Sequence, residues 1–360
     1  MRLRMRSSSS NLRAAAAVLV ALTTPSAFAQ QVSGKVTADG SQPIPGAIVK
    51  VQAKGGVQTV VSNTADDGSF SFTGIKTDQA LLSVEKNGQL LFRSIVSTKT
   101  GVPLTINLQK PFQLADWHPA DMTADPAQGV LVVDRTGGVS RIRGDTQGPH
   151  QDVLFRIPSS YAVSSLAADG GIVVVTTNSA IGCTLFRFTV ASGTTDQKVL
   201  SPGNTCSGIA LLGASMNVVF SKQREVRHWD DWNSSGRVLA GLGSGAALGA
   251  LIFDRQGSRL LAADTDGHVY AVPLAGGKTA QLTSGAGWIG SLAAGPNHIL
   301  MASGKKILMI SRADNRGENP PSVLQSLTGG TIAGIAFDAA GNFWYADYDH
   351  GEVTGPLILK

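Results

Sequence analysis

Short apolar runs that alternate with polar residues dominate this chain, and turn residues separate them. In the C-terminal two-thirds, one such run recurs six times, beginning at a small or polar residue and usually ending in Asp. The last residues of successive copies are 44, 43, 42, 41 and 43 positions apart. A period in the low forties predicts a repeat architecture. The six copies occupy residues 121–125, 165–169, 208–212, 250–254, 291–295 and 334–338.

Each copy is followed by a turn, a β-rich run, a polar turn and another strand, as in residues 259–264 and 267–270. These apolar runs are too short for core helices, and Gly and Asp bound them. Four strands in each of six repeats predict a six-bladed β-propeller over residues 111–360. Because the last repeat ends soon after its third strand, we expect residues 112–114 to supply the fourth and so remove an exposed edge.

Residues 30–110 carry closely spaced alternating runs, such as 47–51 and 69–72, with a strong turn signal between them at Asp67 and Gly68. This pattern predicts a small β-sandwich, so that the fold class is all-β with two domains. The segment also resembles the carboxypeptidase regulatory-like domain, which implies a non-catalytic sandwich of the transthyretin type. The resemblance rests on Gly34 with Val36, the runs 45–49 and 64–72, and Gly74 with Ile75.

Residues 1–29 have the pattern of a cleavable signal peptide. Four arginines precede a short apolar run, 14–22, and the small residues Ala27 and Ala29 fit a signal peptidase site. The run is too short to span a bilayer as a permanent helix. We therefore expect cleavage after Ala29, export by the general secretory route, and a periplasmic or secreted protein. The alternative is a disordered basic tail.

The net charge belongs mostly to this segment. The chain has 30 Lys and Arg against 25 Asp and Glu, and removal of residues 1–29 leaves 26 against 25. The mature chain therefore has no strong bulk field to attract nucleic acid or an anionic membrane. We expect no nucleic-acid partner and no membrane span in the mature protein.

The cysteines of the chain are Cys183 and Cys206. The loop between the second and third strands of a propeller blade lies on the same face as the loop between blades. Cys183 falls at the first kind of loop and Cys206 at the second, so we expect a disulfide in an exported protein. Two free buried thiols are the alternative, and we expect no metal site at this pair.

Asp134, Asp264 and Asp347 occupy equivalent positions at the ends of second strands. Asp at such a position usually caps its own turn. The alternative is that these carboxylates point into the central funnel, where they would bind a cation or a polyol, with Asp349 and His350 on the same face.

Aromatic side chains also gather where the first strands of the blades begin, at the face where propellers usually bind ligands. His118 and Trp288 take equivalent positions there, and Tyr161 lies one residue before that position. Tyr and Trp are suited to contacts with a protein or a sugar. The candidate binding residues are Trp288, His118, Tyr161, Asp264, Asp347 and Asp349.

The run 337–347 resembles the NHL and gluconolactonase-like propellers, in which a buried strand ends in Ala-Asp before a turn. Gluconolactonase-like enzymes need a Glu, Asn and Asp set around a divalent metal, and we find no Glu at the start of a first strand. The repeats also resemble those of streptogramin lyase-like propellers, which use a His base with a metal. That resemblance makes His268 and His350 the candidate catalytic residues.

The function expected from the sequence is that of an exported, non-enzymatic binding or scaffolding protein that presents the funnel face of a propeller to a protein or carbohydrate ligand. We expect no cofactor for this function. The alternative is a propeller lyase or lactonase that uses a divalent cation.

Overall fold

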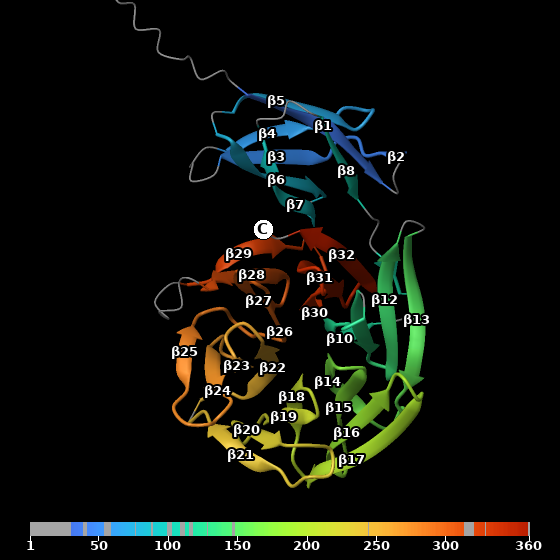
Figure 1. Cartoon of the computed structure of the whole chain (residues 1–360), viewed down its shortest axis with the longest axis vertical. Helices are drawn as coiled ribbons and strands as arrows, with labels where there is room; N and C mark the ends of the chain where they lie inside the picture. Colours follow the sequence, from blue (N-terminus) through green and yellow to red (C-terminus); the bar gives the residue numbers. More distant parts are fainter. Residues whose placement is uncertain are drawn as a thin grey trace, which may run out of the picture.

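The computed structural model describes residues 30–38, 42–53, 59–75, 77–87, 89–98, 103–108, 112–114, 118–127, 129–145, 148–243, 245–312, 320–327 and 329–358. Strands and turns make up this part of the chain, and the all-β prediction is confirmed (Figure 1). The expected signal peptide, residues 1–29, lies outside the described residues. Within the described ranges, the structure contains no helix of the length and hydropathy that a membrane crossing requires.

Eight strands form the first part of the molecule. They are β1 (Gln30–Ala38), β2 (Gln42–Pro43), β3 (Ile48–Ala53), β4 (Thr59–Asn63), β5 (Ser69–Ile75), β6 (Gln79–Lys86), β7 (Gln89–Ser97) and β8 (Leu104–Leu108). One sheet has the order β2-β1-β5, with β8 parallel to β1, and the other has the order β4-β3-β6-β7. Val49 and Val51 of β3 and Phe70 and Phe72 of β5 point into one shared core. The alternation in the sequence therefore produces the predicted sandwich.

The remaining strands form six antiparallel sheets of four strands each, arranged as a ring (Figure 1). The innermost strands are β10 (Pro119–Ala124), β14 (Ala162–Asp169), β18 (Cys206–Leu212), β22 (Leu248–Asp254), β26 (Ser291–Ala294) and β30 (Ile332–Phe337). The second strands are β11 (Val130–Asp134), β15 (Ile172–Ser179), β19 (Ser215–Phe220), β23 (Arg259–Asp264), β27 (His298–Ser303) and β31 (Asn342–Asp347).

The third strands are β12 (Gly138–Asp145), β16 (Gly182–Thr189), β20 (Glu225–Trp229), β24 (Val269–Pro273), β28 (Lys306–Ser311) and β32 (Glu352–Ile358). The outermost strands are β13 (Gly148–Arg156), β17 (Thr194–Pro202), β21 (Arg237–Gly241), β25 (Ala280–Thr283), β29 (Ser322–Ser326) and β9 (Phe112–Gln113). We number the blades 1 to 6 in chain order. The face where the innermost strands begin is the start face, and the opposite face is the end face.

Blade 6 confirms the predicted closure of the ring. Its outermost strand is β9, which pairs antiparallel with β32 through Phe112 opposite Val353 and Gln113 opposite Glu352. The segment before the first blade therefore completes the last one. This pairing covers an edge that would otherwise expose unpaired backbone groups.

The core of the ring consists of six apolar clusters, each between two adjacent blades. The second strands lie between these clusters and are buried on both faces, so β11 has five buried residues in a row. This burial explains why second strands read as continuous apolar runs instead of alternating ones.

The innermost strands approach one another most closely at the first residue of the six-fold pattern. Five of the six innermost strands have a shift in register directly before this residue. In blade 3 the residue is Gly208, where a Cβ atom would lie 2.6 Å from the Leu251 backbone nitrogen of blade 4. In blade 6 it is Gly334, where a Cβ would lie 2.6 Å from the Met122 nitrogen of blade 1. Glycine at these two positions lets adjacent innermost strands meet.

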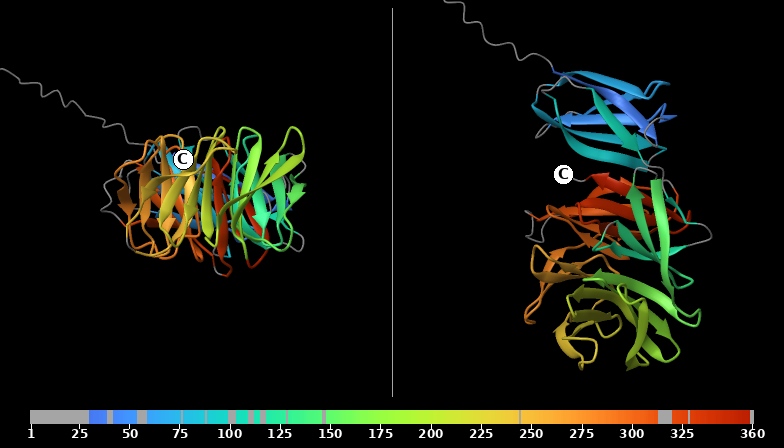
Figure 2. Two further views of the ribbon diagram at one scale, coloured as in Figure 1. Left: turned by 90° about the horizontal axis from the view of Figure 1, so that it is seen from below. Right: turned by 45° about the vertical axis from the view of Figure 1, so that its right-hand side comes forward.

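The sandwich lies beside the rim of the propeller, next to blades 5 and 6 (Figures 1 and 2). Strand β7 of the sandwich contacts β32 and β29. The end face and the start face of the ring therefore both stay uncovered by the sandwich (Figure 2).

A disulfide joins Cys183 of blade 2 to Cys206 of blade 3 on the start face, with Cα atoms 5.5 Å apart. Both cysteines are buried. The side chain of Asn178 supports the same junction, because its amide donates to the Cys206 carbonyl at 2.8 Å and its oxygen accepts from the Cys206 nitrogen at 2.9 Å. The bond therefore connects two adjacent blades at the start of an innermost strand.

Candidate binding site in the central channel

A pocket of about 650 Å³ lies in the central channel of the ring, on the side of the end face. Its lining follows the innermost strands of all six blades and includes residues of the turns after several of them. The pocket therefore opens on the end face. Its volume falls in the range of small-molecule binding sites, roughly 300–1,000 Å³.

Asp121 forms the floor of this pocket. Its Oδ2 accepts hydrogen bonds from the Ser165 hydroxyl at 2.8 Å and from the Leu166 nitrogen at 2.9 Å, both in blade 2. Its Oδ1 accepts from the Met122 nitrogen at 2.8 Å and from the Ser291 hydroxyl of blade 5 at 3.3 Å. The carboxyl group thus crosses the channel from blade 1 to blade 5. These contacts separate the pocket from the start face.

Burial changes the acidity of this carboxyl group. Asp121 is 8% exposed, and burial raises its pKa from 3.8 to about 6, although the four hydrogen bonds act in the opposite direction. A carboxylate in such surroundings loses more hydration than its hydrogen bonds replace. The floor of the pocket is therefore a group that changes its charge in mildly acidic solution.

The walls of the pocket are mainly apolar. Aliphatic and aromatic side chains of the innermost strands line it, and several of them stay partly exposed because no neighbouring blade covers them. The partly exposed lining residues of these strands are Thr123, Ala124, Ala168, Ile252, Phe253, Ala294 and Phe337. Such walls are suited to the apolar body of a small molecule.

Two arginines lie at the mouth of the pocket. Arg312 of blade 5 donates to both oxygens of the buried Asp254 of blade 4, at 2.6 and 2.8 Å, and also to the Gly295 carbonyl at 2.7 Å. Burial alone would raise the pKa of Asp254, but the hydrogen bonds from Arg312, Gly257 and Arg259 hold it below its usual value. Arg255 of blade 4 forms an ion pair of 2.6 Å with Asp169 of blade 2.

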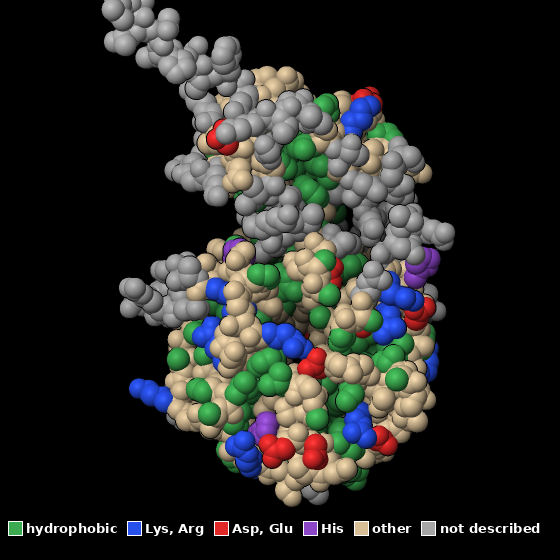
Figure 3. Space-filling view, viewed as in Figure 1, with side chains coloured by type: hydrophobic (Ala, Val, Ile, Leu, Met, Phe, Trp, Pro, Cys, Tyr) green, Lys and Arg blue, Asp and Glu red, His purple; other side chains and the backbone are tan. Residues whose placement is uncertain are grey.

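Acidic residues of the mouth are engaged by local partners. Asp125 accepts from Arg141 and from the Ala127 nitrogen. Asp338 accepts from the Trp344 indole at 2.9 Å and from Asn342 and Ala340. Basic and acidic side chains lie side by side near the centre of the ring in Figure 3. Their charges balance locally, and the mouth has no strong excess of either sign.

The three aspartates at the ends of second strands cap their own turns. Asp134 accepts from the Gly138 nitrogen, Asp264 from the Asp266 and His268 nitrogens, and Asp347 from the Asp349 and His350 nitrogens. Gly137 and Gly267 complete the first two turns with φ values of 92° and 90°, which favour glycine. The turn capping expected of these residues is therefore present in all three turns.

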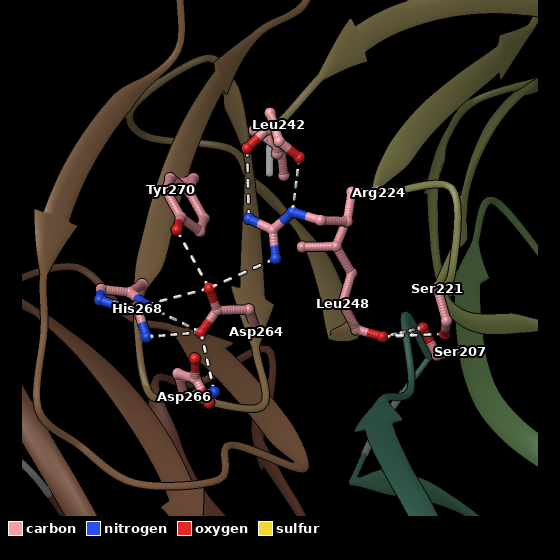
Figure 4. Close-up of polar contacts among 10 residues, drawn as sticks. Ser207, Ser221, Arg224, Leu242, Leu248, Asp264, Asp266, His268 and Tyr270 are labelled. Atoms are coloured by element: carbon pink, nitrogen blue, oxygen red, sulfur yellow. Dashed lines mark hydrogen bonds and ion pairs between the residues drawn. The ribbon is translucent and has the colours of Figure 1, made fainter. Parts of the chain in front are cut away.

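Asp264 is also the centre of a polar cluster on the start face (Figure 4). Its carboxylate accepts from the Tyr270 hydroxyl at 3.0 Å and contacts Nδ1 of His268 at 3.0 Å, and Nη1 of Arg224 lies 3.7 Å away. Burial would raise the pKa of Asp264, but the hydrogen bonds from His268 and Tyr270 keep it below the usual value. The cluster holds together the turns of blades 3 and 4.

His350, the second candidate histidine, also contacts the aspartate that caps its turn. Nδ1 of His350 lies 2.8 Å from Oδ2 of Asp347, and this hydrogen bond raises the pKa of His350. Asp349 is exposed beside it. Both His268 and His350 therefore interact with the aspartate that caps their turn. In the ranges that the structure describes, no group of three or more His, Cys, Asp and Glu side chains is arranged to hold a metal ion.

The aromatic candidates also lie on the start face. Trp288, between β25 and β26, is 53% exposed. His118 is exposed and packs at a tilt against Tyr348, with ring centroids 5.1 Å apart and with Arg135 over the Tyr348 ring. Tyr161 accepts a hydrogen bond from Gln197 and packs edge-on against Phe186. Trp288 and His118 are thus exposed at this face, whereas Tyr161 is half-buried.

The candidate residues from the sequence and the central pocket therefore lie at opposite faces. The residues that line the pocket include none of Trp288, His118, Tyr161, Asp264, Asp347 and Asp349. A role in binding for these six residues stays a prediction about the start face. Sequence reasoning missed Asp121, although it is the charged residue among the first residues of the six copies, where the others are Ser, Gly or Ala.

Comparison with known proteins supports both folds. Residues 31–109 match the model of the carboxypeptidase regulatory-like domain. No curated protein is a significant sequence match to the chain. A protein of unknown function from Bacteroides thetaiotaomicron superposes with a TM-score of 0.53 at 13% identity, covering 85% of this chain and 89% of that one.

Two further solved structures are similar in the propeller. A chain of a nidogen/laminin complex has a TM-score of 0.51 at 16% identity, covering 60% of this chain and 84% of that one. A streptogramin B lyase has a TM-score of 0.50 at 14% identity, covering 68% of this chain and 95% of that one. At these identities the likeness concerns the fold alone. Residues 31–109 are thus a carboxypeptidase regulatory-like domain, and a six-bladed β-propeller follows it.

Proposed function

We propose that this is an exported, non-enzymatic binding protein that holds a small molecule with an apolar body in the central pocket of its propeller. The observation that carries the proposal is the pocket itself, with its apolar walls and its floor at Asp121. A pre-formed apolar cavity with a few polar groups is the usual form of a small-molecule site.

A fluorescent probe tests this proposal. N-phenyl-1-naphthylamine is neutral and fluoresces in apolar surroundings, and we expect the purified mature protein to bind it. Ala168 lines the pocket, and the equivalent residues of blades 4 and 6 are Phe253 and Phe337. Ala168→Phe should therefore be tolerated by the fold, fill part of the pocket and weaken probe binding about tenfold or more.

The matched control is Ala191→Phe, because Ala191 is exposed in a turn of the same blade. Circular dichroism and the melting temperature establish that both variants are folded. The proposal fails if the wild type binds no probe, or if folded Ala168→Phe binds it as tightly as wild type and the control.

Export is the second part of the proposal, and residues 1–29 are its basis. When the full chain is made in a bacterial host with a general secretory system, the protein recovered from the periplasm or the medium should begin at Gln30. N-terminal sequencing measures this directly. Recovery of the uncleaved chain in the cytoplasmic fraction would contradict the prediction. The disulfide fits export, since structural disulfides persist in oxidising compartments.

The alternative of a metal-dependent lyase or lactonase stays a separate prediction for the start face, with His268 or His350 as the base. Added magnesium, calcium or zinc ions should raise the melting temperature if this alternative holds. A protein or carbohydrate ligand at Trp288 is likewise a prediction for the start face, and it is independent of the pocket.

A further inference from the structure

The charged groups at the mouth of the pocket differ in how many of their hydrogen-bonding atoms are engaged. Arg312 uses all three guanidinium nitrogens, on Asp254 and on the Gly295 carbonyl. Asp125 and Asp338 accept from the partners described above. These groups are therefore occupied by the protein itself and support the shape of the mouth.

Arg255 is the exception among the described charges that line the pocket. Its Nη2 contacts Oδ1 of Asp169 at 2.6 Å, and its side chain is 66% exposed. A guanidinium carries five N–H donors, so most of them face solvent at the mouth. The guanidinium carbon also lies 5.8 Å from the ring centre of Phe253, a wall residue of the pocket.

The ion pair of Arg255 spans the mouth. Arg255 follows the innermost strand of blade 4, whereas Asp169 ends that of blade 2, and the turn of blade 3 lies between them. Oδ2 of Asp169 is held by the Gly213 nitrogen of blade 3 at 2.8 Å. The aspartate is thus fixed, and the exposed arginine is the partner that can move. The Arg255 side chain is 66% exposed and that of Asp169 13%, so the outer edge of the guanidinium can take a second partner while the ion pair stays in place.

The floor and walls determine how a ligand would be oriented. The buried Asp121 carboxyl repels a second negative charge, and the apolar walls offer an anion no replacement for its hydration. Along an innermost strand, four residue steps separate the floor at Asp121 from the mouth at Asp125, which is roughly 13 Å at the usual rise of a strand. An anionic group is therefore accommodated at the mouth alone.

We propose that the pocket takes a molecule with an apolar body and one anionic group, and that Arg255 determines this specificity by binding the anion at the mouth. The inference rests on the proposed function, because it names the class of ligand for the same pocket. A carboxylate or a sulfonate supplies oxygens that match the planar guanidinium in a charge-assisted, bidentate pair. The ligand then replaces or shares the contact with Asp169.

Two probes with one scaffold test the inference. N-phenyl-1-naphthylamine is the neutral member, and 1-anilinonaphthalene-8-sulfonate adds a single anionic group. On the mature wild-type protein we expect the sulfonate to bind at least as tightly as the neutral probe, with an affinity that falls as salt rises. Arg255→Gln should weaken the sulfonate about tenfold, as expected for loss of hydrogen bonds to a charged group, and leave the neutral probe unchanged.

Two further variants sharpen the test. Asp169→Asn keeps a hydrogen-bond acceptor for Gly213 and removes the competing charge, so it should strengthen binding of the sulfonate by a few-fold and leave the neutral probe unchanged. Arg237→Gln is the matched control, because Arg237 is an exposed arginine on the outermost strand of blade 3. The control should bind both probes as wild type does.

The outcomes separate this inference from the function on which it rests. If the neutral probe binds and Ala168→Phe weakens it, but Arg255→Gln leaves the sulfonate unchanged, the pocket binds ligands and the role of Arg255 is overturned. Equal loss of both probes in Arg255→Gln also overturns it, since that result means a structural role. Failure of the wild type to bind the neutral probe overturns the proposed function, and the inference with it.

Discussion

Replacement of Asp121 by Asn should remove a pH dependence of about 2 kcal/mol from the free energy of unfolding between pH 4 and pH 7. The pKa of Asp121 is about 6 in the folded protein, against a usual value of 3.8. A difference of about two units corresponds to about 3 kcal/mol over the whole titration, of which about 2 kcal/mol falls between pH 4 and pH 7 because the unfolded chain is already largely ionised at pH 4. The cause is burial of the carboxyl group at the floor of the pocket.

The sign follows from proton binding. Between about pH 3.8 and pH 6 the folded protein holds the Asp121 proton, whereas the unfolded chain has released it. The stability that Asp121 contributes is therefore greatest below pH 3.8 and declines as pH rises to 6. The amide introduced by Asp121→Asn has no proton to lose, so the stability of the variant relative to wild type should be about 2 kcal/mol more favourable at pH 7 than at pH 4.

Urea denaturation of both proteins at pH 4, 5, 6 and 7 measures this difference, and contributions from other titrating groups cancel between them. Asp266→Asn, at an exposed residue of the start face, is the control and should follow wild type. A constant difference in stability between Asp121→Asn and wild type at all four pH values would contradict the prediction.

Loss of the disulfide should lower the free energy of unfolding by about 3 kcal/mol. Cys183 and Cys206 are 23 residues apart, and in the chain-entropy account a cross-link over a loop of this length removes conformational entropy from the unfolded state and raises its free energy by about 3 kcal/mol. The bond also connects blades 2 and 3, whose apolar cluster includes both cysteines. The double substitution Cys183→Ala with Cys206→Ala avoids burying new hydroxyl groups.

Urea unfolding with and without dithiothreitol tests this expectation. The wild type should unfold at a lower urea concentration when it is reduced, whereas the double alanine variant should not respond to the reductant. Equal midpoints for oxidised and reduced wild type would contradict the prediction. Ala168→Phe serves as a control for a change in the same blade that keeps the disulfide.

Much of the architecture follows from local signals in the sequence. Second strands such as 130–134 are continuous apolar runs because neighbouring blades bury both of their faces. Turns such as 264–267 contain the Asp that caps them and the Gly that completes them. Because these signals recur with one period, they determine the number of blades. The closure predicted through Phe112 and its neighbours is confirmed by the pairing of β9 with β32.

The candidate site was predictable from the sequence only in part. The capping role of Asp134, Asp264 and Asp347 is readable from sequence, because it depends on hydrogen bonds within a few residues. The location of the pocket is not readable from the sequence, since it depends on which side chains block the channel. Asp121 and Ser291 are 170 residues apart and meet across the axis of the ring. Their contact separates the pocket from the start face, where the aromatic candidates lie.

The sequence by itself determined the all-β class, the sandwich, the six blades and the closure of the ring, because strand periodicity and turn chemistry act over a few residues and repeat. The tertiary structure alone decided which face the pocket opens on, that Asp121 is its floor, and that Arg255 and Asp169 meet over its mouth. The physical reason is that a ring brings together side chains from non-adjacent blades. Their meeting depends on the reach of each side chain across the channel, which no local pattern encodes.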